Sequence, residues 1–285
     1  MAKTWFITGT SKGFGREWAE AALDRGDNVA ATARDAGQLQ PLAERYGDAV
    51  LPLQLDVTDR AAAFTTVAQA AAHFGSLDVV VNNAGYGQLG MVEELSEGDI
   101  RAEMETNFFG ALWVTQAALP IMRRQRAGRI IQVTSEGGVR AFPQFGAYHA
   151  SKWALEGLSE ALSQEVGPFG IHVTCVEPGP YATDWGTVGL RRAEENPAYQ
   201  DLRDAIRDSI RDAIGRGGWE RGDPAATRAA ILTVADADQP PLRIFFGKSL
   251  EPVTEAYQRR LATWNEWQPV SLEAFGRSTS HSQFA

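Results

Sequence analysis

Short apolar runs, rich in β-branched residues, alternate along the chain with longer segments of helical period. The runs that predict strands are TWFITG (4–9), NVAATAR (28–34), VLPLQLD (50–56), LDVVVNNAG (77–85), GRIIQVTS (128–135), HVTCVEPG (172–179) and LRIFFG (242–247). Segments of helix length lie between them, such as Gly13 to Arg25 and Ala61 to Phe74. This β-α order predicts an α/β fold with a doubly wound, parallel, seven-stranded sheet, helices on both faces and right-handed crossovers.

The alternation breaks once, between Gly179 and Leu242, where the chain is longer than one strand and one helix require. An insertion at about 184–222 carries an apolar stripe that recurs every four residues, which predicts an amphipathic helix. The stripe consists of Leu202, Ile206, Ile210 and Ile214. A C-terminal extension at about 249–285 follows the last strand, and the whole chain is expected to form one domain.

Composition narrows the class of protein. The chain has 285 residues, of which 44% are hydrophobic and 22% charged, as in globular proteins. A formal net charge of -9 and the lack of a long basic run argue against nucleic-acid binding. No apolar run approaches the ~18 residues of a membrane span, and the N-terminal segment lacks the apolar core of a signal peptide. Cys175 is the only cysteine and lies in a strand-like run, so we expect a buried, inert thiol in a cytoplasmic protein.

Three glycines follow the first predicted strand directly. Gly9, Gly13 and Gly15 stand in ITGTSKGFG, at the start of the first predicted helix. Glycine there permits a tight turn and the close approach of a pyrophosphate to backbone N–H groups at a helix N-terminus. The spacing differs from G-x-G-x-x-G, and a plain strand-to-helix turn is the alternative interpretation of the trio alone.

A tyrosine and a lysine stand four residues apart at the head of another apolar-striped segment. On a helix, Tyr148 and Lys152 share one face, one turn apart. A free phenol titrates near pH ~10, and a neighbouring ammonium is expected to lower that pKa and to make the tyrosine a usable general acid or base. A surface helix that happens to carry this pair is the alternative.

Polar residues stand where other predicted strands end. Ser135 closes one strand and the NNAG motif, Asn82 to Gly85, closes another, so both lie at the carboxyl edge of the sheet, where open α/β proteins bind ligands. The Ser135 hydroxyl can hydrogen-bond a substrate oxygen that gains charge, or it can cap a turn. Asn107 falls on a helical segment among apolar neighbours, in a functional or a structural role.

The motifs TGTSKGFG, NNAG, NFFG, VTS, YHASK and EPGPYAT occur in this order along the chain. In them, over about residues 3–248, the sequence resembles the compact branch of the short-chain dehydrogenase/reductase family. The resemblance implies a Rossmann-type fold and a catalytic tetrad of Asn107, Ser135, Tyr148 and Lys152. Tyr148 would exchange a proton with the substrate oxygen that Ser135 polarises. Lys152 would hold the nicotinamide ribose, and Asn107 would support a proton-relaying water.

The same resemblance implies a set of contacts with a nicotinamide dinucleotide. Asp56 would contact adenine, Asn83 would contact the adjoining ribose, and Thr183 would bind the carboxamide. Together with Tyr148 and Lys152, the implied cofactor-binding residues are Gly9, Ser11, Lys12, Gly13, Phe14, Gly15, Arg34, Asp56, Val57, Asn83, Ala84, Gly85, Pro178, Gly179, Tyr181 and Thr183.

The end of the second strand bears on the choice between NADP and NAD. Ala33 stands where relatives that prefer NAD carry an acidic residue, and Arg34 follows it. An arginine binds a 2′-phosphate, whereas a carboxylate binds the ribose diol and repels phosphate. With Lys12 as a second cation, NADP(H) is favoured over NAD(H). Asp35 keeps NAD as the alternative, because a loop shift can bring its carboxylate to the ribose.

By the same resemblance, the insertion is expected to form a mobile lid over an apolar substrate, although an ordinary surface helix explains its stripe as well. The aromatic and aliphatic side chains expected at the lid and the pocket wall are Trp185, Val188, Leu190, Trp219, Phe142, Phe145, Tyr86 and Leu89. We expect His149 on the helix surface and no metal site. FFGALWVTQAALPIM (108–122) is apolar on nearly all sides, which, with the pairing of relatives through this helix, predicts a homodimer or homotetramer.

These features predict an NADP(H)-dependent oxidoreductase that interconverts a ketone and a secondary alcohol, with ketone reduction favoured where NADPH is abundant. Among relatives, the insertion and extension look most like carbonyl reductases and hydroxysteroid-type dehydrogenases, which are ketoreductases acting on sizeable apolar substrates. The alternatives are a non-catalytic NADP(H)-binding regulator, an NAD-linked alcohol dehydrogenase and a sugar-nucleotide epimerase or dehydratase.

Overall fold

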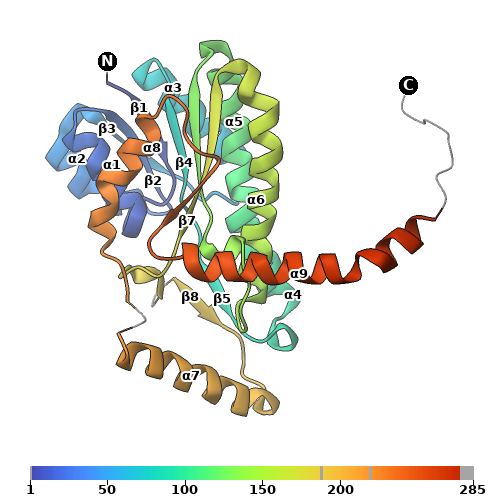
Figure 1. The fold of residues 1–285 in the computed structure, drawn as a ribbon. Helices are drawn as coiled ribbons and strands as arrows, with labels where there is room; N and C mark the ends of the chain where they lie inside the picture. The colour runs from blue at the N-terminus through green and yellow to red at the C-terminus, as the bar shows by residue number, and fades with distance from the viewer. Residues whose placement is uncertain (1, 187–188, 218–219, 277–285) are drawn as a thin grey trace.

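The computed structural model describes residues 2–186, 189–217 and 220–276. Its centre is a seven-stranded sheet in the order β3-β2-β1-β4-β6-β7-β9, and every neighbouring pair is parallel (Figure 1). The strands are β1 (Thr4–Ile7), β2 (Asn28–Ala33), β3 (Val50–Gln54), β4 (Val79–Asn82), β6 (Gly128–Val133), β7 (Ile171–Pro178) and β9 (Arg243–Phe246). All seven predicted strands are thereby confirmed.

Helices cover both faces of this sheet. The helices of the α/β unit are α1 (Gly13–Asp24), α2 (Gln40–Tyr46), α3 (Arg60–Phe74), α4 (Glu97–Met104), α5 (Gly110–Gln125), α6 (Gly146–Val166) and α8 (Thr227–Asp236). Figure 1 shows α1 and α8 on one side of the sheet and α5 and α6 on the other. The predicted doubly wound α/β fold is confirmed.

Alternate residues of the strands supply two separate cores. Trp5 and Ile7 of β1 pack with Trp18 of α1 and Ile231 of α8 on one face. Phe6, between them in sequence, belongs to the core on the other face with side chains of α3, α5 and α6. This division follows from the two-residue period of a strand. Since both faces are covered, the strands read as continuous apolar runs rather than as alternating ones.

The strand order positions the site. Chain order runs outward from β1 through β2 to β3, and then crosses back to β4 on the other side of β1. The loops that leave β1 and β4 therefore diverge at the carboxyl edge, where open α/β sheets form a ligand crevice. The glycine turn follows β1 and the NNAG motif closes β4, so both motifs lie at this crevice.

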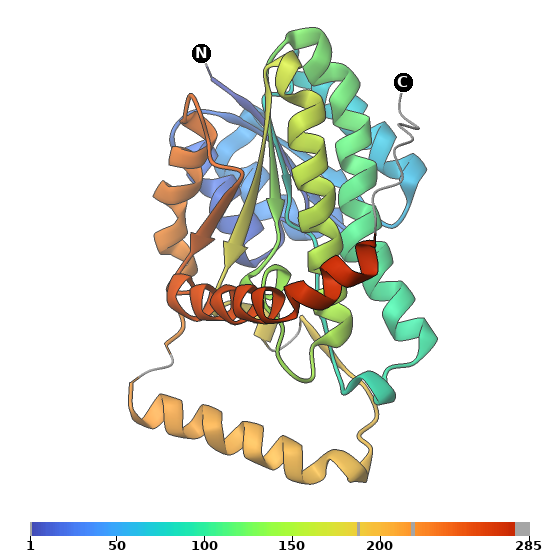
Figure 2. The same cartoon turned by 45° about the vertical axis from the view of Figure 1, so that its right-hand side comes forward.

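The sequence pattern did not predict a second, small sheet, which joins the insertion to the segment after β4. Two three-residue strands, β5 (Gly87–Leu89) and β8 (Leu190–Arg192), pair in parallel to form a second sheet. The predicted amphipathic helix is α7 (Gln200–Gly215), which lies beyond the carboxyl edge and apart from both helical layers (Figure 2). Its stripe is turned largely to solvent in this structure, with Leu202, Ile210 and Ile214 43%, 43% and 51% exposed.

The described part of the C-terminal extension is a single long helix, α9 (Leu250–Phe275), which runs out from the body of the molecule (Figure 1). Within the described ranges, none of the helices combines the length and the apolar character that crossing a membrane requires. Cys175 is buried, as expected. Val188 and Trp219, expected at the lid, lie outside the described residues.

Candidate active site

The glycine turn links β1 to the first turn of α1. Gly9 and Gly13 have φ values of +70° and +58°, a backbone region that favours glycine. A Cβ atom on Gly15 would lie 2.4 Å from the Gly9 carbonyl oxygen, so a larger side chain has no space there. Because α1 begins at Gly13, the free N–H groups of its first turn face this crevice. The turn therefore has the form of an anion cradle.

The end of β4 is fastened to this turn. The Asn83 side-chain amide donates hydrogen bonds to the carbonyl oxygens of Thr8 (2.8 Å) and Gly9 (3.1 Å). In return, the Thr8 hydroxyl accepts the backbone N–H groups of Asn83 and Ala84, both at 2.9 Å. The side chain of Asn83 thus holds the glycine turn rather than pointing free into the crevice.

Tyr148 and Lys152 lie on the same buried face of α6, with 7% and 5% of their surfaces exposed. The Lys152 ammonium donates to the Val133 carbonyl oxygen (2.8 Å) and lies 5.8 Å from the centroid of the Tyr148 ring. The phenol shares a hydrogen bond with the Ser135 hydroxyl, which also accepts the Gly137 N–H at 3.0 Å. The structure therefore brings together the three residues that the sequence predicted would cooperate.

The electrostatics of the pair differ from the expectation. Burial raises the pKa of Tyr148, the hydrogen bond with Ser135 opposes this, and the charges of Glu103 and Glu136 raise it further. Burial also lowers the pKa of Lys152 to about 8, against the charges of Glu103 and Glu156. The predicted lowering of the pKa of Tyr148 by the neighbouring ammonium is not found in this structure, because desolvation dominates and the one opposing cause is the hydrogen bond with Ser135.

Asn107 is buried in a π-helical turn, Glu105–Phe109, between α4 and α5. Its amide donates to the Tyr86 carbonyl oxygen (2.9 Å) and to the Ser151 hydroxyl (3.1 Å), and its Oδ1 accepts the Tyr86 N–H (3.1 Å). A Cβ on Gly85 would lie 3.0 Å from Asn107 Oδ1 and 3.6 Å from Lys152 Nζ. Asn107 and Lys152 therefore flank the same short stretch of backbone.

Two functional candidates in this region, Glu103 and Ser151, were not identified from the sequence. Glu103 is fully buried one helical turn before Asn107, and its Oε1 accepts the Gln88 N–H (3.0 Å) and lies 3.5 Å from Asn107 Nδ2. Its Oε2 has no hydrogen-bond partner among the described residues. Ser151 donates to the Tyr148 carbonyl oxygen (2.8 Å) while it accepts from Asn107. The i, i+4 spacing of Glu103 and Asn107 was the available signal.

Burial raises the pKa of Glu103 to about 7, whereas the Gln88 N–H and the charges of Lys152 and Arg191 lower it. The carboxyl therefore changes charge near neutral pH. Lys152 and Glu103 each shift the pKa of the other toward the charged form, so they behave as a coupled pair inside the protein.

Aromatic rings cover the phenol. The Trp185 ring lies 5.2 Å from that of Tyr148, and Phe145 lies 6.1 Å from Tyr148 and 6.4 Å from Trp185. Phe142 contacts Phe145 edge to face at 5.5 Å. Two of the predicted residues, Phe145 and Trp185, thus meet at Tyr148, and Phe142 packs behind Phe145. Of the others, Tyr86 stacks under the Arg191 guanidinium (4.2 Å), and Leu89 and Leu190 lie on the small β5-β8 sheet.

His149 was expected on the helix surface, and that prediction was wrong. It is 5% exposed, and its ring nitrogens lie 2.8 Å from the Gly137 carbonyl oxygen and 3.1 Å from the Phe142 nitrogen. The imidazole therefore ties the loop after β6 to α6. Among the described residues, His, Cys, Asp and Glu do not gather in groups of three or more that would suit a metal ion.

At the end of β2, Ala33 is buried and Arg34 is exposed. The Asp35 carboxylate caps a short 3-10 helix (Ala36–Leu39) by accepting the Gly37 N–H at 3.0 Å, and it lies 3.4 Å from Gln38 Nε2. Lys12 is exposed just before α1. The carboxylate is thus engaged within its own turn, whereas both cations are open to solvent.

The remaining predicted cofactor residues lie around the same edge. A Cβ on Gly13 would lie 3.9 Å from the Cβ of Thr183, so the segment after β7 reaches the glycine turn. Tyr181 packs edge to face on Phe14 at 4.9 Å, and the Gly179 N–H donates to the Phe246 carbonyl oxygen (2.9 Å). The others are Ser11, partly exposed beside the turn, Pro178 at the end of β7, the buried Val57, and Asp56, whose carboxylate accepts from Thr58.

The insertion is anchored at the start of α7. Arg203 is 6% exposed and its guanidinium pairs with Glu94 at 2.6 Å, with Glu195 3.5 Å away on its other side. Tyr199, just before the helix, donates to Glu93 at 2.6 Å. One end of α7 is therefore fixed to the segment that follows β5.

This fold and this site define a class of protein, and comparison with known proteins identifies it. A family model described as short chain dehydrogenase matches residues 3–191, and the chain belongs to the short-chain dehydrogenase/reductase family. It is therefore an oxidoreductase of a family whose fold binds a nicotinamide cofactor and whose members act on small molecules.

Individual relatives match over almost the whole chain. Oxidoreductase BOA17 of Botryotinia fuckeliana is 39% identical over 274 residues, 95% of this chain and 99% of the relative. A 3-ketodihydrosphingosine reductase of Bacteroides thetaiotaomicron is 35% identical over 260 residues, 90% of this chain and 91% of the relative. The crystal structure of a short-chain dehydrogenase from Streptomyces avermitilis superposes with a TM-score of 0.87 at 40% identity, covering 96% of this chain and 100% of that one.

Proposed function

We propose that the protein is an NADP(H)-dependent oxidoreductase that interconverts a ketone and a secondary alcohol, with reduction as the favoured direction. The observation that carries the proposal is the buried Tyr148 hydroxyl, which shares a hydrogen bond with Ser135 on the face of α6 that also holds Lys152. A proton donor and a second hydroxyl at one point suit a carbonyl oxygen that gains negative charge.

The residues present fit a dinucleotide. The backbone at Gly15 has no room for a side chain, the first turn of α1 offers N–H groups to a pyrophosphate, and Thr183 lies beside Gly13. When bound, the nicotinamide supplies or accepts the hydride. Lys152 would hold its ribose, and Asp56 and Asn83 would lie toward the adenosine half.

In reduction, Tyr148 holds the proton that passes from its hydroxyl to the substrate oxygen, while the Ser135 hydroxyl keeps that oxygen in place. The raised pKa of Tyr148 suits this direction, because the phenol stays protonated until the substrate is bound. The Lys152 ammonium stabilises the phenolate that is left behind. Ionised Glu103, in turn, favours the charged form of Lys152. Asn107 keeps the backbone at Tyr86 in position.

The preference for NADP(H) is supported by the end of β2. The carboxylate that would bind a ribose diol, Asp35, is already used as a helix cap. Arg34 and Lys12 are exposed cations on the loops that leave β2 and β1. A 2′-phosphate can bind two such cations through charge-assisted hydrogen bonds.

We propose a largely apolar substrate. The rings of Phe145 and Trp185 lie beside the phenol, with Phe142 packed on Phe145, and a relative is described as a 3-ketodihydrosphingosine reductase; both observations support a ketone with an apolar body. The insertion at about 184–222 would act as the lid and bring the apolar stripe of α7 toward the substrate. A cytoplasmic location and a homodimer or homotetramer belong to the same proposal.

The direct test is NADPH oxidation with a panel of ketones that ranges from small and polar to long-chain and aromatic. The expected result is turnover that rises with apolar size, slower turnover with NADH, and transfer of deuterium from 4-deuterated NADPH to the carbinol carbon. Tight NADPH binding without turnover of any ketone or alcohol would instead favour a non-catalytic regulator. An NADH preference would favour the NAD-linked alternative.

A further inference from the structure

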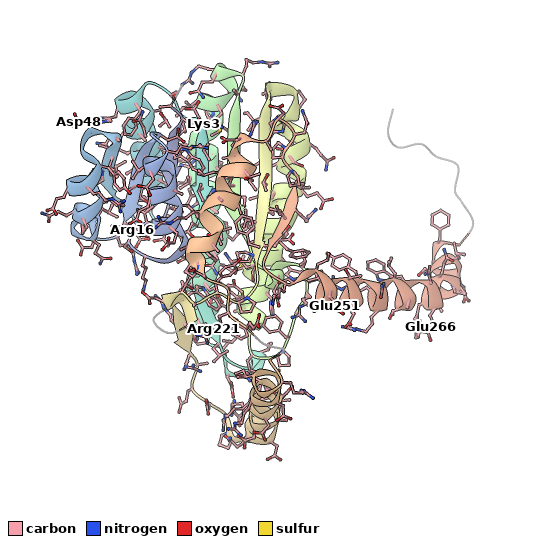
Figure 3. The ribbon with its side chains drawn as sticks, turned by 60° about the vertical axis from the view of Figure 1, so that its left-hand side comes forward. Lys3, Arg16, Asp48, Arg221, Glu251 and Glu266 are labelled. Carbon is pink, nitrogen blue, oxygen red and sulfur yellow. The ribbon has the colours of Figure 1, made fainter. Side chains whose placement is uncertain are left out.

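The outer half of α9 stands free of the body. Every residue from 261 to 276 is exposed, and Figure 3 shows Glu251 beside the body and Glu266 on the projecting part. The inner half is held by Val253, which is buried, and by Arg260, which donates to the Val139 carbonyl oxygen (3.1 Å) and stacks on Trp153 (4.6 Å). One end of the helix is thus docked, Thr263 and Trp264 line a groove with Arg140 and Ala141 of the body, and the part after Trp264 projects from the body.

Eight exposed large apolar side chains lie on this helix; six of them follow one line, whereas Trp267 (59% exposed) and Val270 (53% exposed) lie off it. The exposed fractions of the six lie between 44% and 72%. We call this line of side chains the α9 stripe, and it consists of Leu250, Tyr257, Leu261, Trp264, Leu272 and Phe275. The spacings from Leu250 to Trp264 are seven, four and three residues, the period of a helix–helix seam. The four glutamates of α9 lie away from this line, at Glu251, Glu255, Glu266 and Glu273.

Such a helix is poorly stable by itself. Isolated helices shorter than about 12–15 residues are marginal in water, and Pro269 removes a further hydrogen bond in the projecting part. An exposed stripe of this kind marks an interaction surface. An aromatic side chain buries about 150–250 Å², so the stripe offers on the order of 600 Å² per protomer and about 1,200 Å² in a symmetric pair, which reaches standard interface size.

The charges select the occupant. α9 carries four glutamates and two arginines, and the chain has a formal net charge of -9, so neither an anionic membrane nor a nucleic acid is attracted to it. Apolar residues spaced by seven, four and three positions pack best against another helix with the same spacing. We propose that the stripe packs against α9 of a second copy of this chain. This interface is separate from the pairing through α5 and α6 that the family resemblance implies.

The first test is the solution mass of the full chain at micromolar concentration. The wild type is expected to have twice the mass of Trp264→Glu, which is two 31.0 kDa chains against one where α9 is the sole interface and four against two where the α5–α6 pairing also forms. Trp264→Glu introduces one negative charge per protomer into the contact between the two α9 helices. It is expected to raise the dissociation constant of the pair by at least a hundredfold. Ala262→Glu introduces the same charge beside the seam and is expected to leave the mass unchanged. A monomeric wild type, or equal masses for the wild type and both variants, would overturn the proposal.

Two further measurements identify the occupant. Cys175 is buried, so a short bismaleimide reports only introduced thiols. Leu261→Cys, alone or mixed with Trp264→Cys, is expected to give a covalent dimer, whereas Glu266→Cys on the opposite face gives none. Flotation of the wild type with vesicles of phosphatidylcholine, alone or mixed with anionic phosphatidylglycerol, would assign the stripe to a lipid surface and contradict the pairing if it is lost in Trp264→Glu.

Discussion

Glu103 shows how burial, rather than sequence spacing, sets the charges of the site. It lies under Asn107 and acts on Lys152 of α6, Arg191 of β8, and the Tyr86 and Tyr148 hydroxyls. Above about pH 7 the carboxyl is ionised, raises the pKa of Lys152 and also raises that of Tyr148. Both effects preserve the protonated groups that ketone reduction needs.

Glu103→Gln removes this charge and retains an acceptor for the Gln88 N–H. Because Lys152 and Tyr148 then both lose their protons at lower pH, the high-pH limb of ketone reduction is expected to move down by about one pH unit. Below pH 7 the profile should change little, since wild-type Glu103 is then mostly neutral. The measurement is kcat against pH, with the exposed Glu105→Gln as control. Identical limbs in all three proteins would contradict the role assigned to Glu103.

Arg34 is expected to decide between the two dinucleotides. Arg34→Ala removes a charge-assisted partner of the 2′-phosphate, which is worth about 1.5–3 kcal/mol, or roughly 10- to 100-fold in the KM for NADPH. The KM for NADH should stay within about twofold on this account. Arg45→Ala, on α2, serves as the matched loss of an exposed arginine. An equal loss with both cofactors in Arg34→Ala would show that Arg34 acts on the fold and not on the phosphate.

At this scale, sequence spacing could predict which residues meet but not their electrostatics. Four-residue spacing was sufficient to place Tyr148 and Lys152 on one face. The pKa of Tyr148 depends on how completely the loop after β6 and Trp185 exclude water, which depends on tertiary packing. A glutamate inside a helix normally reads as surface charge, so Glu103 gave no signal by residue type alone.

Among the elements, the glycine turn is the most constrained, and two alanine substitutions separate its requirement from general helix propensity. Gly15→Ala places a Cβ against the Gly9 carbonyl oxygen and is expected to destabilise the fold by about 1–3 kcal/mol and to weaken NADPH binding. Gly157→Ala, in α6 with nothing within 4 Å of the new Cβ, is expected to stabilise by about 0.5–1 kcal/mol. Urea unfolding measures both. A neutral Gly15→Ala would show that the turn is open.

The anchor of α7 gives a second prediction for an element. Arg203→Ala leaves the buried Glu94 carboxylate without its ion-pair partner. Breaking a buried ion pair in this way lowers the free energy of unfolding by about 3–5 kcal/mol. Amide hydrogen exchange in residues 200–215 is expected to accelerate strongly. The exposed Arg207–Asp204 pair (3.0 Å) is the control, because Arg207→Ala should change exchange little. Equal protection in both variants would show that Arg203 does not hold the helix.

The sequence predicted the long elements well and the short ones poorly. Seven apolar runs gave seven strands, and Leu202 to Ile214 gave a helix, because each carries a full period. β5 and β8 have three residues each, too few to show a period, and they form only by pairing with each other. The π-helical turn around Asn107 has no sequence pattern of its own, and the stripe of α9 shows amphipathicity without showing what covers it.

For the whole molecule, the β-α alternation was sufficient to predict a parallel sheet covered on both faces. It did not establish the strand order, because the step from β3 back to β4 leaves no mark in hydrophobicity. That order comes from the structure. The apolar stripes of α7 and α9 are exposed in a single chain. Their partners cannot be predicted from the sequence pattern, which shows an apolar face and not what covers it.

The central claim is that the assembled protein reduces a ketone by proton donation from Tyr148, and Tyr148→Phe tests it most directly. With NADPH and the best ketone of the panel, the variant is expected to lose about 10²–10⁴-fold in kcat, because it keeps the ring and loses the donor. NADPH affinity, followed by fluorescence titration, should stay within about threefold, since the hydroxyl is not expected to dominate cofactor binding. Full activity in Tyr148→Phe, with NADPH bound normally, would contradict the account.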